Sequence, residues 1–267
     1  MILGLYMIYQ NRNLRINNIK SSPSRHCYGM GLGIIILDEI YPGFPGDTRN
    51  ASAYPFPIQY EIAEGLDGKK LLFQEDKSSF LLPIKIAAQK LEKIGCRAIA
   101  GECGYFAYFQ TEIANCVQIP VFMSSLLQVP LAQQLIRQDR VVGIIVFSKT
   151  ILTNAHLQAV GITSNSNYII EGIFENNNCS ELTELYMNSN PLERNADYEK
   201  IEQQLTQFAL DFKQKHPQIG VLLLECSGMQ PFARAIQEAI NLPVFSWGTL
   251  LDYAYSIVVH RDYYGHI

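Results

Sequence analysis

The chain has 267 residues, of which 48% are apolar and 17% charged, and its formal net charge is −4. Such a composition can bury one large core or two modest ones. The slightly acidic balance excludes the basic footprint of a nucleic-acid binder, and charges of mixed sign give no polybasic run for a membrane surface. We therefore expect neither a nucleic-acid nor a membrane partner.

Six cysteines are spread along the chain without a C-x-x-C pair, and no H-E-x-x-H stretch is present. This pattern argues against a zinc site, so no metal is expected. Scattered cysteines without a secretory signal are typical of reduced thiols in a cytoplasm. Residues 1–30 are expected to form an N-terminal extension, because the apolar stretch Met1–Tyr9 is too short to span a bilayer and lacks the basic residues of a signal peptide.

From residue 33 onward, short apolar runs alternate with amphipathic segments of helical period. The expected strands are 33–37, 98–101, 121–123, 141–147, 168–170, 221–224 and 244–245. The expected helices are 80–94, 105–116, 126–138, 153–160, 198–215, 230–240 and 250–259. This alternation predicts an α/β fold whose parallel sheets are covered by helices on both faces.

The strongest signal is an internal repeat. When the sequence is shifted by 123 positions, residues 98–127 align with residues 221–250 without a gap. Glu102-Cys103 then falls on Glu225-Cys226, and Pro120-Val121-Phe122 falls on Pro243-Val244-Phe245. The repeat predicts two pseudo-symmetric Rossmann-like or flavodoxin-like halves with the active site in the cleft between them. The first half would comprise 31–140 plus 247–267, and the second half 141–246.

Cys103 and Cys226 are the candidate catalytic residues. Each follows a buried strand and precedes a helix, which is where open α/β folds bind ligands and where a helix N-terminus stabilises a thiolate. One sulfur on each side of a ligand could remove a proton from a carbon and return a proton to its opposite face. The alternative is a structural role, since cysteine is often a small core residue.

Several polar residues near the predicted strand ends are candidate substrate ligands. Asp38 could orient a substrate amine or simply lie solvated in its loop. Ser124 and Ser125 could hold a carboxylate or cap the next helix, and Ser227 could do the same at its own helix N-terminus. Structural roles are favoured for the glutamates before the cysteines, although a carboxylate there would raise the pKa of its neighbouring thiol.

At the two cysteine segments the chain resembles the aspartate/glutamate racemase superfamily. Cys103-Gly104-Tyr105 corresponds to the family's first motif, Cys226-Ser227-Gly228 to its second, and Asp38-Glu39 to the turn after its first strand. The resemblance implies a racemase or epimerase that needs no cofactor, pyridoxal phosphate included, and that inverts the α-carbon of an aspartate- or glutamate-like amino acid or related small carboxylic acid. It also implies substrate contacts at Gly104 and Gly228. These positions carry asparagine and histidine in such racemases, which argues against glutamate as the substrate.

Two other functions remain open from the sequence. The same fold hosts cysteine-dependent isomerases that resemble maleate isomerase, and it could host a ligand-binding protein without catalysis. A homodimer is a further expectation, because an isologous dimer is common among such enzymes.

Overall fold

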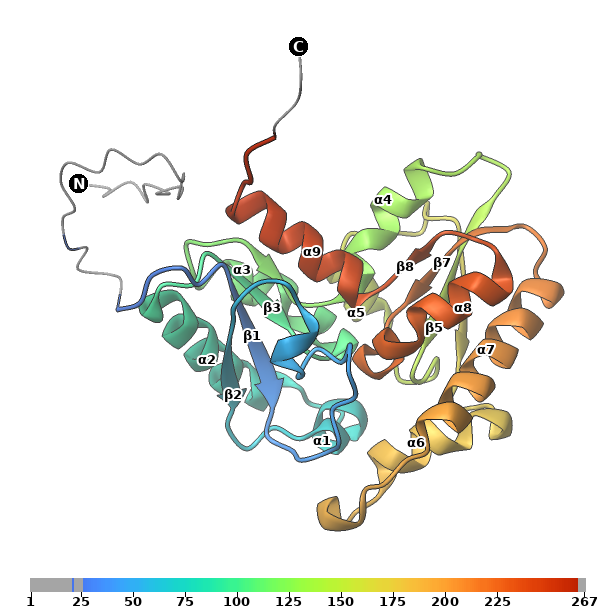
Figure 1. Ribbon diagram of the computed structural model, residues 1–267, viewed down its shortest axis with the longest axis horizontal. Helices are drawn as coiled ribbons and strands as arrows, with labels where there is room; N and C mark the ends of the chain where they lie inside the picture. The colour runs from blue at the N-terminus through green and yellow to red at the C-terminus, as the bar shows by residue number, and fades with distance from the viewer. Residues whose placement is uncertain (1–20, 22–25, 264–267) are drawn as a thin grey trace.

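The computed structural model describes residues 21 and 26–263 and contains two four-stranded parallel sheets, which lie side by side in Figure 1. The first sheet has the order β2 (Ile58–Ala63), β1 (Leu32–Leu37), β3 (Ala98–Gly101), β4 (Val121–Phe122). The second has the order β6 (Tyr168–Gly172), β5 (Val141–Val146), β7 (Ile219–Leu224), β8 (Val244–Phe245). The equivalent strand orders confirm the predicted two-half α/β fold.

The central strands are the ones that the sequence predicts best. β1 (LGIIIL) and β5 (VVGIIV) are almost entirely buried, as expected for β-branched runs between two strands and two helical layers. The edge strand β2 was not predicted. Its sequence, IQYEIA, mixes polar with apolar residues because only one of its sides pairs and most of its side chains are partly exposed.

The helices cover both sheets. They are α1 (Gly68–Phe73), α2 (Leu81–Ile94), α3 (Gln110–Ala114), α4 (Val129–Gln134), α5 (Asn154–Ala159), α6 (Ser180–Met187), α7 (Tyr198–Lys215), α8 (Ala233–Ile240) and α9 (Trp247–Val258). The helix expected over 105–116 begins as the 3-10 segment η3 (Gly104–Phe109), and the one expected over 126–138 begins as η4 (Ser125–Gln128). In the second half, η7 (Ser227–Phe232) precedes α8 in the same way and contains Pro231.

Two helices pack against the sheet of the other half. The C-terminal helix α9 covers the first sheet, and α4, which precedes β5, covers the second. α9, red in Figure 1, buries Trp247 and Leu251 against Leu32 and Ile34 of β1. α4 buries Val129 against the strands of the second sheet, β5 and β7. These two helices therefore connect the halves. The division into 31–140 plus 247–267 and 141–246 remains a prediction.

The expectation of an extension over residues 1–30 falls mostly outside the described residues. In the part of the chain that the structure describes, no helix combines the length and the apolar character needed to cross a membrane.

Candidate active site

The two cysteines occupy equivalent places at the ends of β3 and β7. Each has extended backbone angles and immediately precedes a 3-10 segment, η3 after Cys103 and η7 after Cys226. Both side chains are half-buried, both thiols are free, and both line one cavity together with Ser227. The structure therefore brings together the pair that the internal repeat singled out.

The cavity has a volume of about 60 Å³, several times the roughly 10–15 Å³ that one water needs. Its polar lining consists of carboxyl, hydroxyl and thiol groups, and the rest is aliphatic or aromatic. The lining residues are Leu37, Glu39, Tyr41, Gly68, Leu72, Glu102, Cys103, Tyr105, Phe147, Tyr186, Met187, Glu225, Cys226 and Ser227. The space suits a small molecule with a substantial apolar surface.

The surroundings of the two sulfurs differ. The backbone N–H of Tyr105 lowers the pKa of the Cys103 thiol, whereas the backbone N–H groups of Gly228 and Met229 lower that of the Cys226 thiol. Burial raises the pKa of both thiols above the ordinary value, and Glu225 raises it further in both when its carboxyl group is ionised. Because amide donors stabilise a thiolate, Cys226 has the better-supported anion.

Glu102 is held by a dense set of donors. Its carboxylate accepts the backbone N–H of Leu37 at 2.8 Å, the hydroxyl of Tyr41 at 2.9 Å and Nε of Arg49 at 2.7 Å. The Arg49 guanidinium also donates to the carbonyl oxygens of Glu39 and Leu37. The buried carboxylate is thus paired and hydrogen-bonded, as a structural role would require.

Glu225 occupies the equivalent place with far fewer partners. Its Oε2 accepts the backbone N–H of Phe147 at 3.1 Å, while Oε1 is buried without a hydrogen-bond partner among the described residues. The side chain is fully buried, and this burial raises its pKa to about 8 against the single lowering effect of the Phe147 N–H. Glu225 is consequently mostly in its neutral, protonated form at pH 7.

Two glycines make room for polar groups beside the cysteines. A Cβ on Gly104 would overlap Glu225 Oε1, and a Cβ on Gly228 would overlap the hydroxyl of Tyr186. Side chains at these positions would displace a carboxyl group and a phenol that line the cavity. This close approach explains why glycine stands at both positions, which the resemblance marked as substrate contacts.

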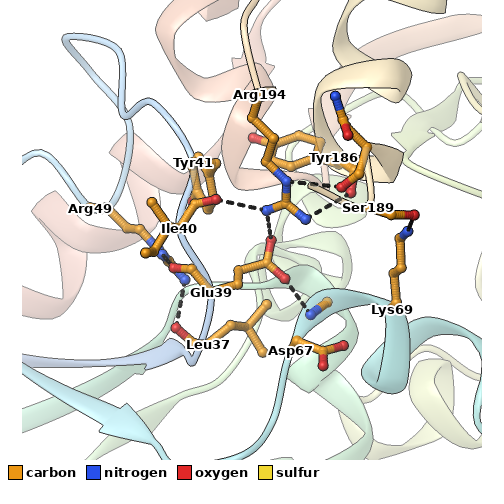
Figure 2. A network of polar contacts seen from close by, with 12 residues as sticks. Leu37, Glu39, Ile40, Tyr41, Arg49, Asp67, Lys69, Tyr186, Ser189 and Arg194 are labelled. Atoms are coloured by element: carbon orange, nitrogen blue, oxygen red, sulfur yellow. Dashed lines mark hydrogen bonds and ion pairs between the residues drawn. The ribbon is translucent and has the colours of Figure 1, made fainter. Parts of the chain in front are cut away.

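A polar network joins the two halves at the cavity (Figure 2). Arg194 donates to Glu39 Oε1 at 2.9 Å and to the carbonyl of Ile40, and it reaches the carbonyl of Tyr186. The other carboxylate oxygen of Glu39 accepts the backbone N–H of Gly68. The Glu39–Arg194 ion pair is almost fully buried, so it links the loop after β1 to the segment after α6 beside the cavity.

Further ionisable groups surround this site. Lys77 is buried and donates to the carbonyls of Leu71 and Gln74, and its charge interacts with Cys103. Asp47 is buried next to this loop network, and burial raises its pKa to about 7. Neither residue lines the cavity.

Not every residue expected at the site lies there. Asp38 is exposed and accepts the backbone N–H of Gly65, while its neighbour Glu39 lines the cavity instead. Ser124 is buried and caps η4 through the N–H of Leu126. Asp38 and Ser124 thus make local backbone contacts, and neither is among the residues that line the cavity.

Ser125 supports the site from behind. Its hydroxyl donates to the carbonyls of Leu224 and Glu225, and the indole N–H of Trp247 donates to the same Glu225 carbonyl at 2.7 Å. Ser125 is fully buried and is not among the residues that line the cavity, and its hydrogen bonds hold the strand end in place.

Sequence reasoning missed several cavity residues. No pattern in the sequence singles out Tyr41, Tyr105 and Tyr186, which line the cavity, or Arg49 and Arg194, which pair with its carboxylates. The aromatic content of the chain gave no signal for these tyrosines, because their common feature is a position at a strand end or on α6, which only the fold reveals. Around the cavity, as in the rest of the described chain, no three His, Cys, Asp or Glu side chains cluster so that they could hold a metal ion.

Comparison with solved structures identifies the class of fold. An allantoin racemase from Pseudomonas fluorescens superposes with a TM-score of 0.55 at 11% identity, covering 85% of this chain and 90% of that one. A glutamate racemase from Bacillus anthracis gives 0.52 at 16% identity over 87% and 85%. An arylmalonate decarboxylase gives 0.54 at 12% identity over 88% and 98%. The chain therefore shares the fold of these two racemases and this decarboxylase.

Sequence comparison finds relatives among the dimethylsulfoniopropionate lyases. A dimethylsulfoniopropionate lyase from Durusdinium sp. clade D is 28% identical over 226 residues, which are 80% of this chain and 70% of that protein. Dimethylsulfoniopropionate lyase 3 of Emiliania huxleyi is 26% identical over 222 residues, 80% of this chain and 56% of that protein. The chain therefore spans little more than half of the latter. No family model matches the sequence.

Proposed function

We propose that this protein is a cysteine-dependent lyase that removes a proton from the α-carbon of a small sulfonium carboxylate and expels the sulfonium group from the β-carbon. The observation that carries the proposal is the single cavity that joins both thiols to the aromatic rings of Tyr41, Tyr105, Phe147 and Tyr186. The likeness to dimethylsulfoniopropionate lyases names the substrate to test first.

The aromatic lining suits a methylated sulfonium cation. Ring faces attract cations that carry methyl groups, as in the aromatic cages that bind quaternary ammonium ligands. The rings of Tyr41 and Tyr186 meet edge to face at 5.2 Å, and Phe147 and Tyr186 at 6.1 Å, which makes one continuous aromatic wall. Glu39 and Glu102, in contrast, already pair with arginines and offer no free carboxylate to a substrate ammonium group.

The proposed reaction needs one base. A cysteine thiolate takes the α-proton, the C–H electron pair forms the carbon–carbon double bond, and the bond from the β-carbon to sulfur breaks with its electrons leaving on sulfur. Dimethylsulfoniopropionate would give dimethyl sulfide and acrylate, and the thiol would then release its proton. Proton removal by a positioned side chain is general base catalysis and calls for no cofactor.

The cation of the substrate would help to form the thiolate. Burial raises the pKa of both thiols, and the charge of Lys77 interacts with that of Cys103. A sulfonium group bound against the aromatic wall places a positive charge in the same cavity, which favours the thiolate. We assign the base to Cys226, because two backbone N–H groups, those of Gly228 and Met229, lower the pKa of its thiol and only one lowers that of Cys103.

A racemase or epimerase acting on a small carboxylic acid is the second candidate. The equivalent positions of Cys103 and Cys226 on one cavity favour it, because inversion requires an acid and a base on opposite faces of the carbon. Both candidates begin with the same proton abstraction. They differ in whether the β-carbon carries a leaving group.

The deciding experiment measures dimethyl sulfide release by gas chromatography and follows the substrate by NMR in D₂O. The wild-type protein should release dimethyl sulfide and acrylate from dimethylsulfoniopropionate. Cys226→Ser should lower the rate by at least about 100-fold, the usual contribution of a general base. Cys103→Ser should retain a larger share of the activity, since elimination needs only one base.

The same samples with single-enantiomer amino acids and hydroxy acids provide the contrast. Deuterium uptake at the α-carbon with inversion, lost in either serine variant, would establish the racemase instead. Cys116→Ser, which changes a half-buried thiol outside the cavity, is the matched control and should leave the release of dimethyl sulfide unchanged. A full rate in Cys226→Ser would contradict the assigned base.

A further inference from the structure

Glu225 is a buried acid in the cavity that takes no part in the proton abstraction proposed above. Its side chain is fully buried, lines the cavity and has one oxygen, Oε1, without a hydrogen-bond partner among the described residues. Leaving a buried polar atom without a hydrogen bond costs free energy. A bound ligand that hydrogen-bonds to Oε1 would remove this cost.

The backbone around Glu225 is built to hold it in place. Oε2 accepts the N–H of Phe147, which leaves Oε1 to carry the acid proton when the group is neutral. Oε1 lies in the space that a Cβ on Gly104 would occupy, next to Cys103 of the opposite half. The carbonyl of Glu225 is itself fixed by Ser125 and Trp247.

The cations near the cavity are already engaged. Arg49 pairs with Glu102 and Arg194 with Glu39, and the Lys77 ammonium donates to two backbone carbonyls. A substrate carboxylate in this cavity therefore needs another donor. We propose that Glu225 is a substrate-binding residue whose protonated carboxyl group donates a hydrogen bond from Oε1 to the carboxylate of the substrate.

This assignment rests on the carboxylate substrate of the proposed function and adds a role in the reaction. Negative charge builds up on the substrate carboxylate as the α-proton leaves, and a hydrogen bond from a neutral acid strengthens with that charge. A carboxylic acid kept neutral by burial is an established device for this purpose. A deprotonated Glu225 would instead repel the substrate.

The other ionisable groups around Glu225 leave it neutral in the working range. The buried groups that interact with Glu225 are Cys103, Tyr105 and Cys226, and all three have a raised pKa and stay uncharged near pH 7. Farther out, Lys77 interacts with Cys103, Glu102 raises the pKa of Cys103, and Asp47 raises that of Cys226. Burial raises the pKa of Glu225 itself to about 8.

The test measures the binding of propionate by calorimetry at pH 7 and pH 9, with propionamide as the uncharged control. A site that needs a proton on a group with a pKa of about 8 should bind propionate about tenfold more weakly at pH 9 than at pH 7. Propionamide, which lacks the charge, should show no such pH dependence.

Two substitutions isolate Glu225. Glu225→Gln keeps an acceptor for Phe147 and a donor toward the ligand, so it should bind propionate at pH 7 and lose the dependence on pH. Glu225→Leu removes the donor and should bind weakly at both pH values. Asp47→Asn removes the other acid with a strongly raised pKa in this region, about 7, and should keep the tenfold change.

Binding to the wild type that stays constant between pH 7 and pH 9 would overturn the assignment. A folded Glu225→Gln protein that fails to bind at pH 7 would also overturn it, because the carboxylate form would then be required. If propionate binds as expected but dimethylsulfoniopropionate yields no dimethyl sulfide, the role of Glu225 stands and the lyase proposal fails.

Discussion

Glu102 and Glu225 end equivalent strands and accept equivalent backbone N–H groups, from Leu37 and Phe147, yet only Glu102 meets a guanidinium, with Arg49 Nε at 2.7 Å. One carboxylate is compensated by charge and the other is isolated. Burial consequently dominates the pKa of Glu225 and leaves this acid protonated near neutral pH.

The stability of the protein should reflect this difference. The folded pKa of Glu225, about 8, lies above the roughly 4.3 of an exposed glutamate, so the native state keeps a proton that the unfolded chain releases. Its contribution to stability is complete below the unfolded pKa and is lost as pH rises through the folded pKa. Between these two pKa values the free energy of unfolding of the wild type should fall with rising pH, relative to that of Glu225→Gln, by up to about 1.4 kcal/mol per pH unit. Urea denaturation at a series of pH values measures this difference.

Glu102→Gln is the contrast for that series. It strands the Arg49 guanidinium in a buried position, so it should lower the free energy of unfolding at every pH where Glu102 is ionised. If the free energies of unfolding of Glu225→Gln and the wild type changed in parallel with pH, Glu225 would not be an isolated buried acid.

The ion pair between Glu39 and Arg194 should be a major tie between the halves. Both side chains are nearly buried, at 9% and 5% exposure, so Arg194→Met leaves the Glu39 carboxylate uncompensated. We expect a loss of about 3–5 kcal/mol in the free energy of unfolding. Arg137→Met removes the exposed pair with Asp139 and should change stability by less than about 1 kcal/mol.

The aromatic wall should discriminate charge. Tyr186→Leu should raise the KM for dimethylsulfoniopropionate by roughly 5- to 30-fold, the equivalent of about 1–2 kcal/mol of cation–π attraction, whereas Tyr186→Phe keeps the ring and should change KM little. Inhibition by 4-methylpentanoate, in which carbon replaces the sulfonium sulfur, should be similar in all three proteins. Equal losses for both ligands in Tyr186→Leu would instead indicate a loss of packing.

The space at Gly104 should be indispensable. A methyl group there overlaps Glu225 Oε1, so Gly104→Ala must displace the carboxyl group, at a cost of about 1–3 kcal/mol for overpacking. We expect weaker propionate binding and a lower melting temperature. Gly43→Ala is the control, because its nearest neighbouring atom, Arg49 Cβ, would lie 3.9 Å away.

The internal repeat carried most of what the sequence could predict. Two copies of a strand, a Glu-Cys pair, a helix and a Pro-Val-Phe strand predicted two equivalent sheets, and the structure shows them with equivalent strand orders. The same repeat put Cys103 and Cys226 at corresponding strand ends, which is why the prediction of a shared cleft could be made without coordinates.

What the sequence could not show depends on long-range contacts. Arg49 and Glu102 are 53 positions apart, and Arg194 meets Glu39 across 155 positions, so no local pattern reports either pair. The repeat also made Glu102 and Glu225 look alike. Their different roles arise because the loop that supplies Tyr41 and Arg49 has no counterpart on Glu225, a distinction that only the packed structure displays.

The hydrogen bond from Trp247 to the Glu225 carbonyl makes the indole an intrinsic fluorescent probe of the site. The chain contains one tryptophan, and its ring is fully buried against the strand end that carries Glu225 and Cys226. Tryptophan emission therefore originates from a single place, directly behind the cavity. A ligand that shifts this carbonyl would change the emission of that indole, so occupancy could be titrated by fluorescence without any added label.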